Sequence, residues 1–575
     1  IHEALKFSNL DISEIDHITF PWNPYIAVRN APIYLLKYWK TLPILLKEKK
    51  DFSMEEQLGM INHFGDIKKI PKVIKELFPG KKLKFKFHTL EHHMCHAASA
   101  FYPSGFDEAA ILTYDGAGEW ATTLLGHGKD KKIKKMHTID TPHSIGAPYQ
   151  AVSRFLGFSY GAGPGKLMGL ASYGKRDSEE YRKLKKLIYY TGNGRYKINM
   201  DFFSYHYSRR RRGVSEKFIE LFGSPCKDGT VDWTQSQLNL AAAMQQVTEE
   251  LIFELVKFLK EKTQSKNLCL AGGVALNCVA NGKILKENIF ENIWVQPAAG
   301  DAGGSLGAAL AFWHIEQGNT RIINSNDSMK GSYLGPEYSQ AEIEHQLNNL
   351  GANFKILSEN EIIDLTAANL SNGEAVGWFQ GRMEFGPRAL GARSILGDPR
   401  SDKMQKILNL KVKYRESFRP FAPSILRKDL PDWFEINIDS PYMLLVAGIN
   451  PKKIIKMNSK QENLFGIDKL NIKRSEIPAV THVDYSARIQ TVHENTNLKY
   501  FNLLSEFKKK TGCPVIVNTS FNVRGEPIVC TPEDAYKCFM RTEMDILVLE
   551  NQILLKIDQP KTYKDESWKE TFELD

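Results

Sequence analysis

Three of the chain's 15 histidines fall within five positions, in the segment HHMCH at residues 92–96. On a helix, His92 and His96 lie at i and i+4, so both imidazoles leave the same face about one turn apart and can bind one ion. His93 offers an alternative to His92 through an i, i+3 pair. A helical histidine is more often a core or surface residue than a ligand, so the pair needs further ligands to predict a metal site.

Two carboxylates in glycine-rich turns could supply those ligands. Asp115 ends an apolar strand in TYDGAGEW, and Asp301 lies in AAGDAGGS. Neighbouring glycines let a ligand approach the backbone. Two histidines and two aspartates form a nitrogen and oxygen set suited to Fe(II), Mn(II) or Zn(II), without the thiolates of a structural zinc site. We therefore predict an open metal site made of His92, His96, Asp115 and Asp301.

Several glycine-rich segments are candidates for nucleotide binding. YGAGPGKLMGLASYG places three glycines before Lys166 and suggests an anion loop. It is not a Walker A loop, because Tyr160 and Leu167 stand where that loop needs Gly and Ser or Thr. Each segment is a weak signal alone, since a diglycine after a strand is often simple turn chemistry. Together they could line an adenosine slot, with Gly116, Lys166, Gly272, Gly273 and Asn277 as the candidate residues.

The second half of the chain gathers cationic and hydroxyl side chains on short turns. The segments are GRMEFGPRALGARS, VKYRESFRPFAPS, THVDYSARIQ and VNTSFNVRGEPI. Cations interleaved with Phe, Gly and Pro are costly there unless an anion or an acidic partner fills the space, and arginine forks suit phosphate. A solvated surface is the alternative. The residue types favour a site for a polyanionic small molecule, with candidates Arg388, Lys413, Arg419, His482, Arg488, Asn518, Thr519 and Ser520.

The elements that would position these residues alternate between strands and helices. EAAILTYDGAG predicts a strand that ends at Asp115, ATTLLGHGKDKKIKKMHTI a hairpin, and QLNLAAAMQQVTEELIFELVKFLKEK a long amphipathic helix. This helix leads into the strand and diglycine turn of NLCLAGGVALN. A strand, a carboxylate, a glycine and a returning hairpin is the arrangement with which actin-like and sugar-kinase-like folds hold nucleotide phosphates. The pattern predicts an α/β fold.

A polar stretch at residues 318–340 predicts a linker between two domains. We expect one domain over residues 1–330 and a second over residues 336–575, with strands in AVGWFQG, MLLVAGI, CPVIVNTS and ILVLEN. The chain opens at Ile1 and enters a helix and a strand directly. We therefore expect a segment upstream to be absent.

The composition limits the class of protein. A chain of 575 residues, 42% hydrophobic and 25% charged, is typical of globular proteins with more than one core. No apolar run approaches the roughly 20 residues that span a bilayer, and the N-terminus lacks the pattern of a signal peptide. Seven scattered cysteines without CxxC pairs argue against a disulfide framework and a zinc ribbon. These features predict a cytoplasmic protein with reduced thiols and no membrane partner.

The net charge of +9 and the run SRRRRG at residues 208–213 would permit nucleic-acid binding. The remaining charge is mixed in sign, and no recognised nucleic-acid motif accompanies the run. We interpret the run as a solvated or phosphate-facing loop that is dispensable for chemistry, and we expect no nucleic-acid partner.

These segments, in this order, resemble the O-carbamoyltransferases of the nodulation protein U and antibiotic-tailoring family. The matching segments are HHMCHAASAF, TYDGAGEW, GKLMGLASYG, AGGVALN, GDAGGSLGAA, EFGPRALGARS, RESFRPFAP, HVDYSARIQ and NTSFNVRGEPIV, and they cover nearly the whole chain. The resemblance implies an actin-like (ASKHA) N-terminal domain, similar to the tRNA threonylcarbamoyladenosine transferase subunit. It also implies an α+β YrdC-like C-terminal domain.

The resemblance further implies an activity. The C-terminal domain would join carbamoyl phosphate to ATP, bound with Mg(II), to give carbamoyl adenylate and pyrophosphate. The N-terminal domain, holding Fe(II) or another divalent metal, would pass the carbamoyl group to a hydroxyl of a natural-product or sugar-like acceptor and release AMP. By position, the metal ligands are His92, His96, Asp115 and Asp301, the adenylate-forming residues are Lys413, Arg488 and Ser520, and Arg388 and Arg419 lie near the nucleotide phosphates.

One departure from this family concerns the start of the chain. Family members begin with a hairpin that carries a His-Asp-Ser-Ala-type motif, whose Asp is thought to act on the acceptor hydroxyl, and no such motif precedes Ile1. We therefore expect a protein made of these residues alone to show no catalytic turnover.

Two other functions stay open at this point. The first domain alone could be a metabolite kinase or ATPase, which would use γ-phosphate without carbamoyl phosphate. A tRNA-modification or hydrogenase-maturation protein is the other alternative, although the maturation type carries an acylphosphatase domain and paired CxxC motifs that this chain lacks. The sequence leaves the acceptor and the oligomeric state open, a homodimer included.

Overall fold

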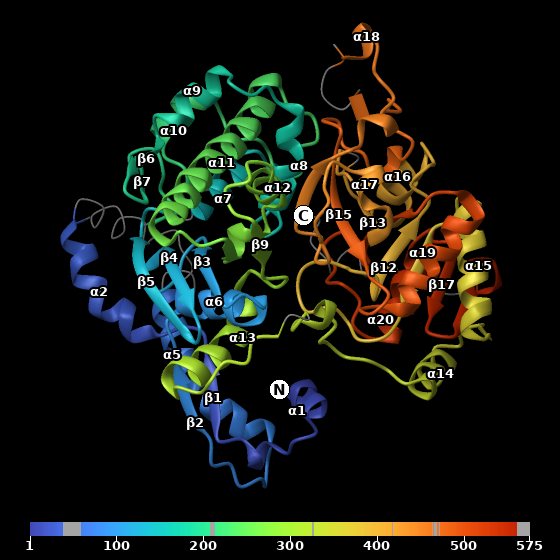
Figure 1. Ribbon diagram of the computed structural model, residues 1–575, viewed down its shortest axis with the longest axis horizontal. Coiled ribbons are helices and arrows are strands. Elements are labelled where there is room, and N and C mark those ends of the chain that lie inside the picture. Colours follow the sequence, from blue (N-terminus) through green and yellow to red (C-terminus); the bar gives the residue numbers. More distant parts are fainter. Residues whose placement is uncertain are drawn as a thin grey trace.

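The computed structural model describes residues 1–37, 39, 59–206, 213–324, 327–416, 418–462, 464, 469–470 and 472–560. The chain forms two lobes, drawn mainly in blue to green and in yellow to red in Figure 1. The first lobe contains a five-stranded sheet and the second a nine-stranded sheet. Both sheets mix parallel and antiparallel neighbours and are combined with helices, so the predicted α/β class is confirmed.

The first lobe holds a small parallel pair of strands, the five-stranded sheet, a hairpin and the surrounding helices. Its strands are β1 (His17–Phe20), β2 (Lys86–Thr89), β3 (Glu108–Tyr114), β4 (Ala121–Lys129), β5 (Lys132–Asp140), β6 (Ile188–Gly192), β7 (Arg195–Ile198), β8 (Asn267–Ala271) and β9 (Asn292–Val295). Its helices are α1 (His2–Ser8), α2 (Pro24–Lys37), α5 (Gly59–Leu77), α6 (His92–Phe101), α7 (Gly146–Phe155), α8 (Gly163–Leu170), α9 (Glu179–Lys185), α10 (Glu216–Phe222), α11 (Gln235–Thr263), α12 (Cys278–Lys286) and α13 (Asp301–Ala311).

Strand β3 lies in the middle of the five-stranded sheet, whose order is β5-β4-β3-β8-β9. It pairs antiparallel with β4 and parallel with β8. Every residue of β3 after Glu108 is buried, as expected for a strand that is covered on both faces. The predicted strand at Asp115, the hairpin of β4 and β5, and the long helix α11 are all confirmed.

Helices cover both faces of this sheet because alternate strand residues point to opposite sides. Ile111 belongs to the core beneath α6 and α13, whereas Leu112 belongs to the core beneath α7 and α11. Helices α6 and α13 approach so closely that a Cβ atom on Gly307 would lie 1.8 Å from the backbone oxygen of Cys95. This contact fixes the two helices that carry three of the predicted metal ligands.

The nine-stranded sheet of the second lobe has the order β10-β18-β17-β11-β12-β16-β13-β15-β14. Its strands are β10 (Lys355–Ile356), β11 (Val376–Phe379), β12 (Arg393–Gly397), β13 (Ala422–Leu426), β14 (Leu445–Gly448), β15 (Ser486–Val492), β16 (Val515–Ser520), β17 (Ile546–Leu549) and β18 (Gln552–Leu555). Its helices are α14 (Gln340–Asn349), α15 (Glu359–Ser371), α16 (Met404–Ile407), α17 (Leu430–Trp433), α18 (Ser459–Glu462), α19 (Leu498–Thr511) and α20 (Pro532–Arg541). The four strands predicted in this half are confirmed as β11, β14, β16 and β17.

The segment between α13 and α14 connects the lobes, and the predicted domain limits at residues 330 and 336 fall within it. The short hairpin of β6 and β7 belongs to the first lobe, above the sheet in Figure 1. Among the described residues, no helix combines the length and the apolar character that crossing a bilayer requires.

Candidate functional site

Four side chains of the first lobe converge beside the C-terminal end of β3. His92 and His96 leave one face of α6, with their Nε2 atoms 3.0 Å apart. Asp115 Oδ2 lies 3.2 Å from His96 Nε2, and Asp301 Oδ1 lies 3.6 Å from His92 Nε2. One ligand atom from each residue falls within 4.8 Å of all the others. The structure therefore brings together all four residues predicted as metal ligands.

The surroundings of His92 fit a ligand role. Its Nδ1 lies 3.1 Å from the backbone oxygen of Pro21, so the proton belongs on Nδ1 and the lone pair of Nε2 points into the cluster. Such a hydrogen bond on the far nitrogen is typical of metal-ligating histidines. His93 instead places Nδ1 2.7 Å from Thr113 Oγ1. The alternative pair through His93 is therefore not formed.

The charge state of the cluster also suits a cation. Burial would raise the pKa of Asp115, but hydrogen bonding to His96, the charges of His96 and His92, and the backbone N–H of Gly273 together lower it. Burial and the neighbouring His96 lower the pKa of His92. A neutral imidazole, which the lowered pKa of His92 favours, and an ionised carboxylate are the forms that bind a divalent metal.

The diglycine after β8 positions Asp115. Gly272 has φ +92°, and a Cβ atom there would lie 2.2 Å from the backbone oxygen of Tyr114. This close approach lets the Gly273 N–H donate to Asp115 Oδ2 at 2.8 Å, while the Gly116 N–H donates to Oδ1 at 2.6 Å. The glycines predicted to line a nucleotide slot thus hold a carboxylate of the cluster. Gly116 and Gly273 also line the adjoining cavity.

Glu119 anchors the start of α6, where backbone N–H groups have no partner within the helix. The His92 N–H donates to Glu119 Oε1 at 3.0 Å, and the Asn23 N–H donates to the same oxygen at 2.5 Å. Burial raises the pKa of Glu119 to about 7 against these hydrogen bonds. Glu119 lies within the segment TYDGAGEW, but it was not among the predicted site residues.

A cavity of about 1250 Å³, the larger cavity, adjoins the set of four predicted metal ligands, which we call the metal cluster. Asp115 and Asp301 line it, together with aromatic side chains such as Trp22 and Tyr149. Its volume exceeds the ordinary range for a small-molecule site. The larger cavity can therefore hold a sizeable organic substrate beside the cluster.

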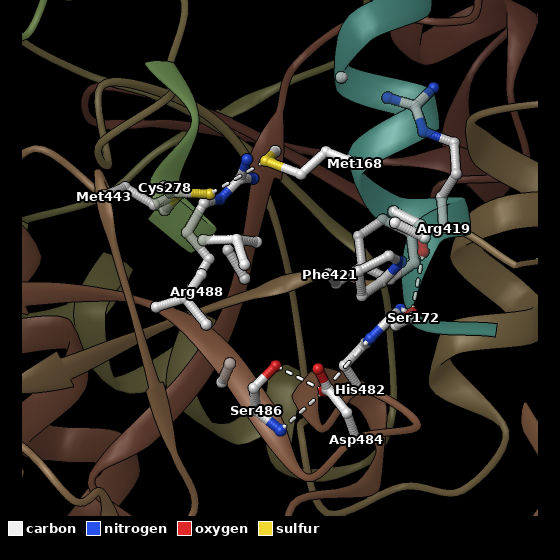
Figure 2. A pocket seen from close by; sticks show the side chains of 18 of the residues that line it. Met168, Ser172, Cys278, Arg419, Phe421, Met443, His482, Asp484, Ser486 and Arg488 are labelled. Carbon is white, nitrogen blue, oxygen red and sulfur yellow. Dashed lines mark hydrogen bonds and ion pairs between the residues drawn. The ribbon is translucent and has the colours of Figure 1, made fainter. Parts of the chain in front are cut away.

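A second cavity of about 450 Å³, the smaller cavity, lies between the lobes. Figure 2 shows Met168, Ser172 and Cys278 of the first lobe facing Arg419, His482 and Arg488 of the second. From the predicted set of the second lobe, the smaller cavity is lined by Arg388, Arg419, His482, Arg488, Asn518, Thr519 and Ser520. Arg415, from the predicted cationic segment VKYRESFRPFAPS, lines it as well.

The arginines of the smaller cavity repel one another. Burial, together with the charges of Arg488 and Arg419, lowers the pKa of Arg388 to about 9. In the described part of the chain, neither Arg388 Nε nor Arg488 Nε has a hydrogen-bond partner. Guanidinium groups held together in this way favour an anion with several oxygens.

His482 is held between the two lobes. Its Nδ1 lies 3.4 Å from Asp484 Oδ1, and its Nε2 lies 3.3 Å from Ser172 Oγ. The Ser172 hydroxyl donates to the backbone oxygen of Gly169 at 3.0 Å, so it can accept from His482. The short chain of contacts fixes the imidazole at the edge of the smaller cavity (Figure 2).

Lys413 lies behind the wall of the smaller cavity and does not line it. Its side chain is 3% exposed, and Nζ donates to the backbone oxygens of Ser520 and Asn522 at 2.5 and 2.8 Å. Burial and the neighbouring Arg415 lower its pKa. These contacts hold the turn that presents Ser520, and a direct catalytic role for Lys413 stays a prediction.

The prediction of an anion loop at Lys166 was wrong in its local structure. Residues 163–170 form helix α8, with Pro164 in the first turn, where its missing N–H costs nothing. Lys166 lines neither cavity, and its Nζ lies 3.4 Å from Glu416 Oε1 of the second lobe. A buried carboxylate therefore occupies the place that we had expected a phosphate to take.

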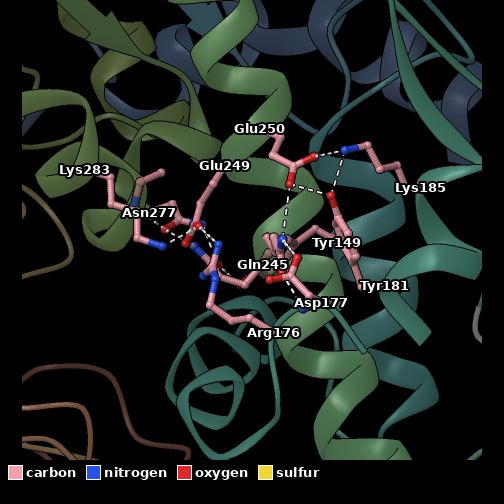
Figure 3. Close-up of polar contacts among 12 residues, drawn as sticks. Tyr149, Arg176, Asp177, Tyr181, Lys185, Gln245, Glu249, Glu250, Asn277 and Lys283 are labelled. Carbon is pink, nitrogen blue, oxygen red and sulfur yellow. Dashed lines mark hydrogen bonds and ion pairs between the residues drawn. The ribbon is translucent and has the colours of Figure 1, made fainter. Parts of the chain in front are cut away.

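Asn277 belongs to a buried polar network on α11 (Figure 3). It exchanges two hydrogen bonds with Gln245, at 3.0 and 3.1 Å, and Gln245 also accepts from the Tyr149 hydroxyl at 2.7 Å. Glu249, one turn further along α11, accepts from Arg176 at 2.9 Å and from Lys283. The sequence offered one indication of this network, which is the presence of polar residues on the buried face of α11.

The two cavities share part of their wall. Arg388 and Arg419 line both, so the cationic region reaches from the interface between the lobes to the metal cluster. The complete shared set is Gly165, Met168, Pro387, Arg388 and Arg419. Of the predicted arginine-rich run at residues 208–213, only Gly213 is among the described residues, and it lines the larger cavity.

Comparison with known proteins now adds to this geometry. Residues 1–310 match the family described as Carbamoyltransferase N-terminus, and residues 367–556 match Carbamoyltransferase C-terminus. An uncharacterized protein of Synechocystis sp. is 47% identical over all of this chain and 92% of its own length. Nodulation protein NolNO of Sinorhizobium fredii is 37% identical over 83% of this chain and 65% of its own length.

Among solved structures, full-length HypF in its phosphate- and nucleotide-bound form overlaps 41% of this chain and 44% of that chain, at 15% identity and a TM-score of 0.28. A likeness this low carries no argument about the site. The two family matches together cover most of the chain. The chain belongs to the carbamoyltransferase family and is an enzyme of that class.

Proposed function

We propose that the protein is an ATP-dependent O-carbamoyltransferase that uses its two cavities for two successive reactions. Carbamoyl adenylate forms in the smaller cavity, and the carbamoyl group passes to a hydroxyl of a small-molecule acceptor in the larger cavity. The observation that carries this proposal is the shared wall, because Arg388 and Arg419 line both the cationic smaller cavity and the larger cavity beside the four predicted metal ligands.

Atom balance defines the first reaction. Water first hydrolyses carbamoyl phosphate to carbamate and inorganic phosphate. A carbamate oxygen then attacks the α-phosphorus of ATP. The bond from that phosphorus to the bridging oxygen breaks, which gives carbamoyl adenylate and pyrophosphate. The arginine forks of the smaller cavity stabilise the negative charge that collects on the phosphate oxygens.

In the second reaction, the acceptor hydroxyl oxygen attacks the carbonyl carbon of carbamoyl adenylate. The bond between that carbon and the AMP oxygen breaks, AMP leaves, and the hydroxyl proton goes to a base. The residues that would hold a divalent metal, Fe(II) by the family resemblance, are His92, His96, Asp115 and Asp301. When bound, such an ion supplies Lewis-acid polarisation of a carbonyl oxygen.

The finer fold assignment rests on the order of strands. A central strand that ends in a carboxylate, a hairpin on one side and two parallel strands on the other support an actin-like first lobe. The mixed nine-stranded sheet flanked by α15 and α19 supports a YrdC-like second lobe. Small-molecule partners, with Mg(II) accompanying ATP, and a cytoplasmic location follow from the same proposal.

The test is isotope exchange with the full-length protein. We expect labelled pyrophosphate to enter ATP only when carbamoyl phosphate is present, and AMP to form when an alcohol acceptor is supplied. Release of ADP or inorganic phosphate from ATP without carbamoyl phosphate would instead support the metabolite kinase or ATPase alternative, and would contradict the proposal.

A further inference from the structure

A buried ion pair joins the two lobes at the wall between the cavities. Lys166 of α8 and Glu416 of the second lobe place Nζ and Oε1 3.4 Å apart, with side chains 1% and 6% exposed. Arg524 NH2 lies 3.4 Å from the same Glu416 oxygen. Neither Lys166 nor Glu416 lines the smaller or the larger cavity. Their contact therefore lies behind the shared wall and supports it.

The neighbours of each partner form the wall itself. Gly165 and Met168, on either side of Lys166 in α8, line both cavities. Arg415 precedes Glu416 and lines the smaller cavity, and Arg419 follows it and lines both. The ion pair therefore fastens the first-lobe half of the wall to the second-lobe half.

A second set of contacts runs beside the ion pair. The Tyr173 hydroxyl donates to the backbone oxygen of Phe418 at 3.0 Å. The Phe418 ring packs 5.3 Å from Trp233 and 6.3 Å from Phe158, measured between ring centroids. The segment around Glu416 is thus docked on the first lobe by several groups, and the ion pair is its charged component.

Charge balance gives Glu416 a further role. Its carboxylate faces Lys166, Arg524 and Arg419, whereas the arginines that line the smaller cavity repel one another. A carboxylate at this point holds the cationic segment against the first lobe. Removal of either partner would upset the charge balance of this buried contact, which displaces the segment or admits water.

We propose that Lys166 and Glu416 are positioning residues that hold the two halves of the shared wall together, so that the carbamoyl adenylate stays shielded from bulk water on its way between the cavities. This inference rests on the proposed function. Carbamoyl adenylate is a mixed anhydride, and water can attack its carbonyl carbon, break the bond to the AMP oxygen and give carbamate and AMP. A wall held together in this way keeps bulk water from the intermediate until the acceptor takes its carbamoyl group, and so prevents this loss.

The experiment compares two rates in the absence of an acceptor. One is carbamoyl-phosphate-dependent exchange of pyrophosphate into ATP, and the other is net release of AMP to water. The variants are Lys166→Met, Glu416→Gln and the conservative Lys166→Arg. The matched control is Lys257→Met, which removes a surface ion pair with Glu254 on α11.

We expect Lys166→Met and Glu416→Gln to raise the ratio of AMP release to exchange by about tenfold, since a displacement of about 1 Å in a closed site can change rates by up to about 10²-fold. Lys166→Arg should restore most of the wild-type ratio, and Lys257→Met should not change it. If a single variant does not fold, the double variant Lys166→Met/Glu416→Gln removes one charge of each sign and keeps the net charge of the contact unchanged, and the same rise is expected from it. An unchanged ratio in a folded variant, or an equal fall in both rates, would overturn the proposal.

A second readout separates this proposal from the proposed function. Hydrogen–deuterium exchange of the peptides covering residues 163–171 and 413–421 should become faster in Lys166→Met and Glu416→Gln, without any substrate present. If the wild-type protein shows no pyrophosphate exchange, the proposed function fails, whereas unchanged deuterium uptake in the variants refutes the ion pair's role alone.

Discussion

Arg488→Ala should separate the two reactions when it is compared with His96→Ala. Arg488 lines the smaller cavity, whereas His96 belongs to the metal cluster beside the larger one. The first variant should lose carbamoyl-phosphate-dependent exchange of pyrophosphate into ATP. The second should keep that exchange and lose delivery of the carbamoyl group to an acceptor.

The expected size of the loss follows from the contacts of Arg488. Its Nε is buried without a partner in the described part of the chain, so its fork is available to phosphate oxygens. Two charge-assisted hydrogen bonds at about 1.5–3 kcal/mol each amount to about 3–6 kcal/mol, or about 10²- to 10⁴-fold in rate. Arg488 repels Arg388 and lowers its pKa. Because Arg488→Ala removes this repulsion, the variant should not lose folding stability.

The assay uses labelled pyrophosphate with ATP and carbamoyl phosphate, followed by transfer from preformed carbamoyl adenylate to an alcohol. Preformed adenylate should rescue transfer in Arg488→Ala and should not rescue it in His96→Ala. Thermal unfolding and circular dichroism check that both variants fold. Equal loss of exchange in both variants, or equal rescue of both, would refute the assignment of two sites and require a single shared active site.

Three further predictions concern stability, metal binding and pH. Gly307→Ala should lower the unfolding temperature, because its Cβ would lie 1.8 Å from the backbone oxygen of Cys95 and overpacking costs about 1–3 kcal/mol or more. Gly300→Ala is the control: apart from its chain neighbours, no atom of the described residues lies within 4 Å of its added Cβ, so this variant should change the unfolding temperature far less. His92→Ala and Asp301→Asn should each lower the iron content measured by elemental analysis after reconstitution with Fe(II), and iron retained at the wild-type level in both would contradict the ligand set. Burial, with the charges of Lys37 and Lys197, lowers the pKa of His143 from its ordinary 6.5 to about 4. Between these two pH values the unfolded state binds more protons than the folded state, so folding stability should fall as the pH drops from about 6.5 towards 4. Urea midpoints at several pH values test this, and His143→Gln should flatten that part of the profile; an equally steep fall in this variant would assign the effect to other groups.

Local patterns in the sequence predicted much of the first lobe and of the metal cluster. The alternation of EAAILTY, the hairpin after it and the i, i+4 spacing of His92 and His96 depend on contacts within one or two elements. The cluster could be inferred because its carboxylates follow strands and glycine-rich turns. These features need no knowledge of how the lobes meet.

Contacts between the lobes could not be predicted in this way. Lys166 and Glu416 are 250 residues apart, and Ser172 and His482 are 310 residues apart. No local periodicity encodes such pairs, so a glycine-rich segment with a lysine was interpreted as an anion loop. The same limit applies to Gly273, whose backbone N–H reaches Asp115 across 158 residues.

The shared wall has a kinetic consequence. Arg388 and Arg419 line both cavities, so under the proposed function the AMP left after transfer and the next incoming ATP would require the same guanidinium groups. The two nucleotides should therefore exclude each other, and AMP should act as a competitive inhibitor against ATP even though it is produced by the other reaction. Under this constraint the enzyme would complete one cycle before it begins the next, and the rate of AMP departure would set an upper limit on turnover.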